Sequence, residues 1–175
     1  KEPRVGVIGA RRATAEQRRM ARTLATALTR SGAVVVSGGA EGVDTEALQA
    51  ALDAGGAPLA VLPCGLDRPY PPENQQLFSA IAAGGGGLCS QVGLEVEARP
   101  GAFLGRNVLM THLLDAVVCV AAGPRSGSLH CSGQAWLQGV PVLAVPWTSG
   151  SPWSEGSNGL LAAGARAVWD ADGCE

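Results

Sequence analysis

The fold is decided by the stretch Val34-Val35-Val36-Ser37-Gly38-Gly39-Ala40-Glu41-Gly42-Val43-Asp44-Thr45-Glu46-Ala47. A β-branched run passes into a glycine-rich turn, and a helix pattern then begins with Asp44 as its expected N-cap. In a parallel α/β sheet such a junction lies at the carboxyl end of a strand, where backbone N–H groups and the positive end of a helix face outward. Gly38, Gly39 and Gly42 permit positive φ and close approach of a ligand. The stretch therefore predicts an anion site, most often for phosphate, although the same glycines also suit an ordinary tight turn.

Length and composition predict a single domain over residues 1–175. The apolar fraction is 46% and the charged fraction 16%, which favours a buried core over disorder. No apolar run reaches the roughly 18 residues of a membrane helix and no signal segment opens the chain, so we expect a cytoplasmic protein. The five cysteines are odd in number and none forms a CxxC pair, so we expect structural thiols, no metal site and no cofactor. They are Cys64, Cys89, Cys119, Cys131 and Cys174.

The charge is unevenly distributed along the chain. The formal net charge of −2 does not by itself indicate a nucleic-acid-binding protein. Residues 1–30, however, hold eight basic groups against two acidic ones. Arg18, Arg19 and Arg22 fit an ordinary solvated helix face, whereas Arg11 and Arg12 follow a strand and are better placed for a ligand.

Strands alternate with helices along the whole chain. Predicted strands cover 5–8, 34–37, 59–62, 88–90, 116–121 and 140–145, with a short one near 167. Predicted helices follow a Thr14 cap with Gln17 in capping-box spacing, then cover 44–54, a segment starting at 70–74, 106–114, 129–138 and 159–163. This order predicts an α/β fold: a Rossmann-like, doubly wound, mostly parallel sheet with helices on both faces.

Three small-residue turns follow strands of this expected sheet. They are Gly9–Arg11, Ser37–Gly42 and Ser126–Ser128. In a doubly wound sheet the carboxyl ends of parallel strands meet at one edge, so these turns are expected to line one crevice. Their convergence predicts a site for a phosphate or a nucleotide more strongly than any single glycine turn does.

The sequence resembles the DNA-processing protein A (DprA/Smf) family in a series of blocks in the same order. The blocks are Val7–Arg11, Val36–Asp44, Ala60–Asp67, Tyr70–Asn74, Arg99–Phe103, Arg106-Asn107, Arg125–Leu129, Val145-Pro146 and Gly156–Leu161. The resemblance implies a Rossmann-like core that binds single-stranded DNA, forms a homodimer and helps to load the recombinase RecA during natural transformation and DNA recombination. It implies no catalysis.

The resemblance also implies which residues contact DNA phosphates. Arg11 and the Ser37–Gly39 turn would bind backbone phosphates, Arg106 and Asn107 would belong to a basic rim, and the loop at 126–128 would form the other wall. With the turns above, the expected phosphate-binding set is Gly9, Arg11, Ser37, Gly38, Gly39, Gly42, Asp44, Arg106, Asn107, Ser126, Gly127 and Ser128. Guanidinium groups and helix N-termini suit such a role.

The chain departs from the family pattern at several positions. Glu41 stands where the family usually has an arginine, Leu48 where it usually has a histidine, and Gly105 and Val108 flank Arg106-Asn107 where relatives are more basic. Each change removes a cation, which lowers the salt-dependent part of nucleic-acid affinity. Tyr70 and Phe103 are the available aromatic side chains near this edge, and we expect both to be packing residues.

These departures keep alternatives open. The crevice could hold a nucleotide or another small phosphate ligand, or the protein could act only through an interaction surface. A nucleoside-monophosphate hydrolase is disfavoured, because Gly123–His130 lacks the paired glycines and the glutamate of phosphoribohydrolases. Gly6 and Gly9 do not form a dinucleotide fingerprint. His130 is expected to be a satisfied histidine beside a helix cap, and His112 is assigned no role.

Overall fold

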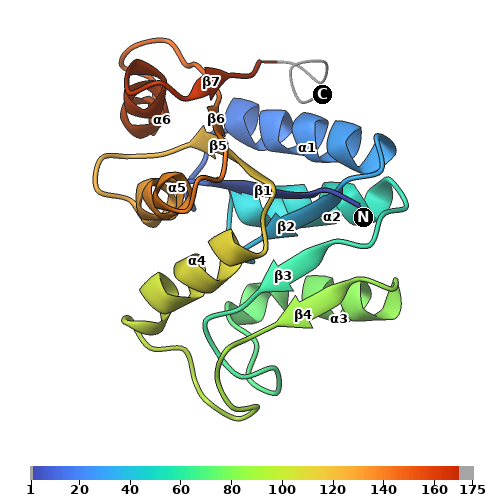
Figure 1. The fold of residues 1–175 in the computed structure, drawn as a ribbon. Helices are drawn as coiled ribbons and strands as arrows, with labels where there is room; N and C mark the ends of the chain where they lie inside the picture. Colours follow the sequence, from blue (N-terminus) through green and yellow to red (C-terminus); the bar gives the residue numbers. More distant parts are fainter. Residues whose placement is uncertain (1, 170–175) are drawn as a thin grey trace.

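The computed structural model describes residues 2–169. Its centre is a seven-stranded sheet in the order β4-β3-β2-β1-β5-β6-β7, in which every neighbouring pair runs parallel (Figure 1). The strands are β1 (Arg4–Gly9), β2 (Val34–Ser37), β3 (Leu59–Val61), β4 (Gly87–Cys89), β5 (Ala116–Ala121), β6 (Val142–Ala144) and β7 (Arg166–Ala167). The predicted doubly wound α/β fold is confirmed. Because the chain order reverses between β1 and β5, the sheet has its switch point there.

Helices cover both faces of the sheet. They are α1 (Ala15–Arg30), α2 (Val43–Asp53), α3 (Gln75–Ala83), α4 (Ala102–His112), α5 (Gly127–Leu137) and α6 (Ser154–Ala162), and a 3₁₀ turn, η1 (Pro72–Asn74), precedes α3. Side chains alternate along β1, so that Val7 packs against α1 and α2 while Ile8 joins the core under α4 and α5. α3 completes the first layer through Phe78 and Ile81, and α6 adds Leu160 to the second.

The first helix begins as its sequence predicts. The Thr14 hydroxyl accepts a hydrogen bond from the Gln17 backbone N–H at 3.3 Å, and the Gln17 side chain accepts one from the Thr14 N–H at 3.0 Å. Leu24 and Leu28 are buried, while Met20 is partly buried against the same core. The capping box and the four-residue apolar period are therefore confirmed.

Four predicted helix starts are corrected. α2 has Gly42 rather than Asp44 as its N-cap, because Gly42 has φ of +81° and lets the chain turn two residues earlier. α5 begins at Gly127, because the Ser126 hydroxyl caps the helix by accepting a hydrogen bond from Leu129 N–H at 3.3 Å. α4 begins at Ala102 and α6 at Ser154, each earlier than predicted, because packing overrides the weak helix propensity of their glycines and serines.

Four cysteines lie in the described residues, and all four are free thiols. Burial raises the pKa of Cys119 and of Cys131 to about 12, so both are protonated core residues, as predicted for structural thiols. The fifth, Cys174, lies outside the described residues. Within residues 2–169 there is no cluster of ligands suited to a metal ion, and none of the described helices is long and apolar enough to cross a membrane.

Candidate functional site

The crevice lies at the carboxyl ends of β1, β2 and β5. One part, here called the inner hollow, has a volume of about 260 Å³ and is lined by Arg11, Ala40, Arg106, Asn107 and the Ser126–Ser128 loop, among others. The second part, the outer hollow, has a volume of about 230 Å³. It shares Arg11, Ala40, Phe103 and Arg106 with the inner hollow and extends over Glu41 and the Tyr70–Glu73 segment. The predicted convergence of the three turns on one crevice is confirmed.

The Asp44 carboxylate occupies the anion position that the glycine turns create. It is 5% exposed and accepts a hydrogen bond from the Ala40 N–H at 3.3 Å and another from the backbone of Gly9. Burial raises the pKa of this carboxyl, and the neighbouring Arg106 opposes the rise. Asp44 therefore braces the turn after β2, and it also lines the inner hollow, so its expected place in the phosphate-binding set stays a prediction.

Arg106 is buried beneath the crevice instead of standing at its rim. Its Nη1 donates hydrogen bonds to the carbonyl oxygens of Gly38 and, at 2.7 Å, of Val61. Its Nε donates to the Asn107 side-chain oxygen at 3.0 Å. Burial lowers the pKa of the guanidinium, and the Asp44 carboxylate offsets part of that effect. Since its Nη2 has no hydrogen-bond partner in the described chain and Arg106 lines both hollows, one edge of the group remains available to a ligand.

The glycines of the two turns serve the packing of the protein itself. A Cβ on Gly38 would overlap the Arg106 guanidinium, and one on Gly9 would lie 2.7 Å from Val43. A Cβ on Gly42 would overlap the carbonyl oxygens of Ala10 and Arg11. The Ser37 hydroxyl is also buried, where it donates to the Val7 carbonyl at 2.6 Å. The glycines of these turns therefore allow close packing around the crevice, and Gly38 also lines the outer hollow.

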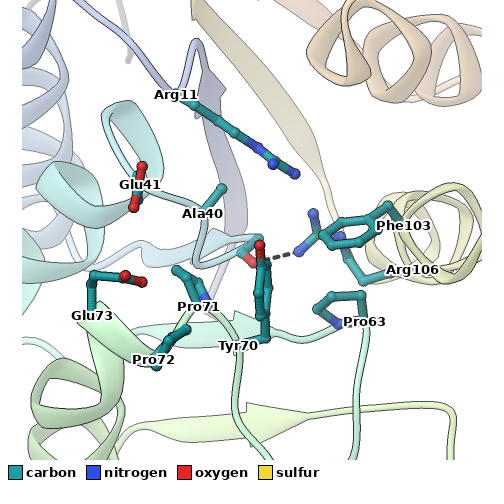
Figure 2. A pocket seen from close by; sticks show the side chains of 11 residues that line it. Arg11, Ala40, Glu41, Pro63, Tyr70, Pro71, Pro72, Glu73, Phe103 and Arg106 are labelled. Atoms are coloured by element: carbon teal, nitrogen blue, oxygen red, sulfur yellow. Dashed lines mark hydrogen bonds between the residues drawn. The ribbon is translucent and has the colours of Figure 1, made fainter. Parts of the chain in front are cut away.

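Arg11 is the exposed cation of the crevice. Its guanidinium carbon lies 5.2 Å from the centre of the Phe103 ring, and no carboxylate pairs with it among the described residues. Figure 2 shows the side chain reaching from the β1–α1 loop toward Phe103 and Arg106. Held over an aromatic face and free of an acidic partner, the group can bind an anion.

Tyr70 and Phe103 form an aromatic pair in the outer hollow. Their ring centres are 5.9 Å apart and their planes meet at 80°, an edge-to-face contact. The two rings pack on each other as expected, and Tyr70 also remains 40% exposed to the outer hollow. The sequence does place Tyr70 beside prolines after β3 and Phe103 beside Pro100, which marks loops, but no pattern brings the two rings together.

Two carboxylates line the outer hollow on its other side. Glu41 and Glu73 are both exposed, and Figure 2 shows them across the hollow from Phe103 and Arg106. The outer hollow is thus divided into a cationic and an acidic side. This division suits a ligand that carries an anionic group at one end and hydrogen-bond donors at the other.

The start of α5 forms the far wall of the inner hollow. The Asn107 amide donates to the Gly127 carbonyl at 3.1 Å and fixes this loop against α4. The N–H groups of Gly127 and Ser128 belong to the first turn of α5 and have no partner within the helix. They line the same hollow as Arg11 and are groups of the kind that bind anions.

The side chains of Asn74 and His130 lie in environments that the sequence did not predict. The buried Asn74 amide donates to the Gly39 carbonyl at 2.9 Å and to the Thr45 hydroxyl at 2.7 Å, which holds the β2–α2 turn in place. The sequence marks Asn74 as part of a helix start, and no local pattern reveals the turn it contacts. His130 Nδ1 is buried without a hydrogen-bond partner in the described chain, so the expected satisfied histidine is not found.

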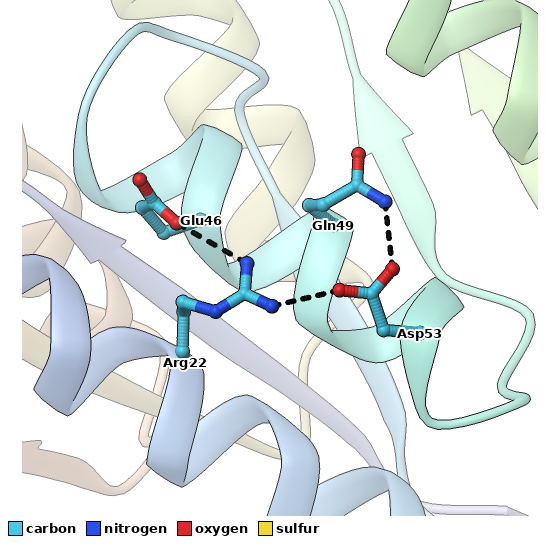
Figure 3. Close-up of polar contacts among 4 residues, drawn as sticks. All are labelled: Arg22, Glu46, Gln49 and Asp53. Atoms are coloured by element: carbon cyan, nitrogen blue, oxygen red, sulfur yellow. Dashed lines mark hydrogen bonds and ion pairs between the residues drawn. The ribbon is translucent and has the colours of Figure 1, made fainter.

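Among the arginines of α1, Arg22 is paired with carboxylates, whereas Arg18, Arg19 and Arg30 are exposed without an acidic partner in the described chain. Arg22 donates to Asp53 at 2.7 Å and to Glu46 at 3.3 Å, and Asp53 also accepts from Gln49 (Figure 3). Arg18 donates to the Ala13 carbonyl at 3.2 Å. The solvated helix face predicted for these arginines is what the structure shows.

The fold and the crevice define a class: a Rossmann-like α/β domain with a crevice lined by Arg11 and Arg106 at the switch point of its sheet. The family described as DNA recombination-mediator protein A matches residues 1–174, and the chain belongs to this family. A putative DNA processing protein DprA from Mycobacterium tuberculosis is 40% identical over 166 residues, which cover 95% of this chain. The match spans 42% of that relative's own length.

Solved structures agree with this assignment. DNA processing protein A from Streptococcus pneumoniae is 31% identical with a TM-score of 0.91, and the match covers 98% of this chain and 60% of that one. DNA processing protein A from Helicobacter pylori, which binds single-stranded DNA, is 34% identical with a TM-score of 0.89 over 97% of this chain and 77% of that one. The molybdenum cofactor binding protein of Rippkaea orientalis shares the fold, with 20% identity and a TM-score of 0.70.

Proposed function

We propose that this domain binds single-stranded DNA in the crevice. The observation that carries the proposal is Arg11, an exposed and unpaired cation placed over Phe103 at the switch point of the sheet. A cation beside aromatic rings is the combination that binds a flexible sugar-phosphate chain together with its bases. The Helicobacter pylori relative, which binds single-stranded DNA, supports the choice of ligand.

In this proposal a phosphate lies between Arg11 and the first turn of α5. The N–H groups of Gly127 and Ser128 and the free edge of Arg106 complete its contacts. An adjacent base would then enter the outer hollow beside Tyr70. Duplex DNA cannot offer an unstacked base to this hollow, so single strands are expected to bind more tightly.

The experiment is fluorescence anisotropy with a labelled oligo-dT strand, titrated at several salt concentrations against a duplex of equal length. We expect the single strand to bind more tightly than the duplex. The logarithm of its association constant should fall linearly with the logarithm of the salt concentration. Absence of single-strand binding at low salt would refute the proposal.

The proposed role is binding in the cytoplasm, without a catalytic step. An oligonucleotide incubated with the protein is therefore expected to be recovered intact. Delivery of the bound strand to RecA is the further part of this proposal, tested by whether the protein speeds RecA assembly on strands already covered by single-strand-binding protein.

We also propose that the domain forms a homodimer. Leu137 is 81% exposed at the end of α5, and the neighbouring Trp136 is 38% exposed, which leaves an apolar surface that a second copy would cover. Light scattering should give twice the monomer mass for the wild type, and Leu137→Glu should shift it toward the monomer. A monomeric wild type at high concentration would contradict this part.

A nucleotide is the second candidate ligand, and the acidic side of the outer hollow favours it. Glu41 and Glu73 can accept hydrogen bonds from a base or a ribose while Arg11 binds the phosphate. Nucleoside monophosphates should then raise the melting temperature in proportion to the logarithm of their concentration. No shift at millimolar nucleotide would exclude this candidate.

A further inference from the structure

Trp153 has an unusual backbone conformation at a second place on the same edge of the sheet. It is the N-cap of α6 and has φ of 58° and ψ of 20°, in the left-handed region. Within residues 2–169 the other non-glycine residue with positive φ is Arg125. A bulky side chain in this region is strained, and such strain is found where the surrounding structure holds a residue for function.

Three contacts hold Trp153 in place. Its carbonyl accepts a hydrogen bond from Ala122 N–H at 2.8 Å, and its indole N–H donates to the Arg12 carbonyl at 2.6 Å. A Cβ on Gly123 would lie 2.9 Å from the indole Cε3, so the absence of a side chain there admits the ring. The ring is thereby fixed in orientation while 39% of the residue remains exposed.

The exposed part of Trp153 faces a third hollow of about 760 Å³. Its walls are Gly123-Pro124 and the Ser149–Glu155 segment, with Asn158. Apart from Glu155 these walls carry no charge, and serine, glycine and proline make up most of them. Trp153 is its one aromatic side chain.

This hollow adjoins the crevice through two loops. The β5–α5 loop lines the third hollow with Pro124 and the inner hollow with Ser126, and the exposed Arg125 lies between them. In the β1–α1 loop, Arg11 lines the crevice, and the next residue, Arg12, holds the Trp153 indole. Two exposed arginines, Arg12 and Arg125, are therefore the neighbours in the chain of residues that line these hollows.

We propose that Trp153 is a second stacking platform for the same DNA strand. A base one or more nucleotides from the crevice would stack on the indole, and Arg12 and Arg125 would lie beside the intervening phosphates. This inference rests on the proposed function and adds a binding site to it. These two arginines favour a nucleic-acid strand over an acidic or apolar protein segment as the occupant.

The test measures affinity against oligo-dT length, from three to twelve nucleotides, at several salt concentrations. The variants are Trp153→Ala and Trp153→Phe, with Trp169→Ala as a control because Trp169 is 63% exposed after the outermost strand, β7. Arg11→Ala tests separately whether the strand binds through the proposed phosphate contact in the crevice. Thermal melting establishes that each variant is folded.

We expect Trp153→Ala to bind the longest strand roughly tenfold more weakly than the wild type, as for the loss of one stacked base. It should bind the trinucleotide equally well, and its salt dependence should be unchanged because no phosphate contact is lost. Trp153→Phe keeps a ring, so its affinity for the longest strand should lie between that of the wild type and that of Trp153→Ala. Long unlabelled strands should quench the wild-type tryptophan emission more than that of Trp153→Phe.

The inference is overturned if Trp153→Ala binds all lengths as the wild type does, or loses equal affinity for the shortest and longest strands. If Trp153→Ala does not fold, the quenching of tryptophan emission by long strands is the deciding measurement. Equal quenching in the wild type and in Trp153→Phe then overturns the inference. Failure of the wild type to bind any strand refutes the proposed function and this inference together. Binding through Arg11 with no effect at Trp153 refutes the inference alone.

Discussion

A carboxylate oxygen of Asp44 accepts a hydrogen bond from the Ala40 N–H at 3.3 Å, inside the glycine turn after β2. The position that most favours an external anion in this type of junction is therefore filled by the protein's own carboxylate. Arg106 lies beside it as the buried counter-charge. The proposed phosphate position therefore lies further out, between Arg11 and the start of α5.

Arg11→Ala is expected to weaken single-strand binding and to flatten its salt dependence. Loss of one phosphate contact reduces the slope of log K against log salt by about 0.7 on single strands. Arg11→Lys should restore most of the slope, because the charge remains, but less of the affinity, because a lysine lacks the planar fork. Arg19→Ala, at an exposed position of α1 outside the crevice, is the matched control and should change neither.

Glu41→Arg is expected to strengthen single-strand binding. The exposed carboxylate lines the outer hollow, so the substitution removes an anion and adds a cation near the proposed phosphates. Anisotropy titrations should show a steeper salt slope, by about 0.7 for one added contact, while Glu41→Gln should raise affinity with a smaller change in slope. An unchanged affinity in both variants would place the strand away from Glu41.

Arg106→Met is expected to lower the free energy of unfolding by about 3–5 kcal/mol, because it leaves Asp44 as a buried charge without its partner. It also leaves the Gly38 and Val61 carbonyls without their donor. Urea unfolding measures the loss. The double variant Asp44→Asn/Arg106→Met should lose less than the sum of the single variants, since the two buried charges interact electrostatically. Additive losses would contradict the pairing.

The loss of stability in Arg106→Met is expected to depend on pH, because Arg106 affects the pKa of Asp44. Burial already raises the pKa of Asp44, and removal of the guanidinium raises it further, so the folded variant binds a proton more readily than the unfolded chain. Lowering the pH through the raised folded pKa toward the usual carboxyl range should therefore reduce the difference in unfolding free energy between the variant and the wild type. A difference that is constant from pH 7 to pH 5 and below would show that Asp44 is not the destabilised group.

Gly42→Ala is expected to destabilise the fold and the crevice together. The residue has φ of +81°, and its Cβ would overlap the carbonyl oxygens of Ala10 and Arg11. Strain of this kind costs on the order of 1–3 kcal/mol before the overlap is counted. Gly55→Ala, with the same φ but open space around its Cβ, is the control that isolates the overlap. Equal losses in the two variants would mean that φ alone matters.

Asp53→Asn is expected to cost at most about 0.5 kcal/mol at neutral pH, because both partners of the α1–α2 ion pair are well exposed. Hydrogen bonds from Gln49 and Arg22 lower the pKa of Asp53. Its contribution is therefore present above the unfolded carboxyl pKa and is lost as the pH falls through the lowered folded pKa. The melting temperatures of the variant and the wild type should therefore become equal at acid pH.

Local patterns were sufficient for the order of the elements. The run Val34–Ser37 and the capping box at Thr14 each depend on residues a few positions apart, and both were predicted with their correct bounds. The start of α4 was misplaced because Gly105 weakens the helix pattern before Arg106, whereas the helix begins at Ala102.

The amino-acid sequence by itself determined that this chain forms a doubly wound sheet whose turns meet at one edge, because strand and helix periodicity and turn chemistry are local properties. Only the tertiary structure decided which groups at that edge are buried and which are free. Asp44 fills the turn, Arg106 lies beneath it and Arg11 stands exposed over Phe103, and these roles depend on contacts between segments far apart in the chain. Burial and pairing fix the charge that a side chain presents, and no spacing in the sequence contains that information.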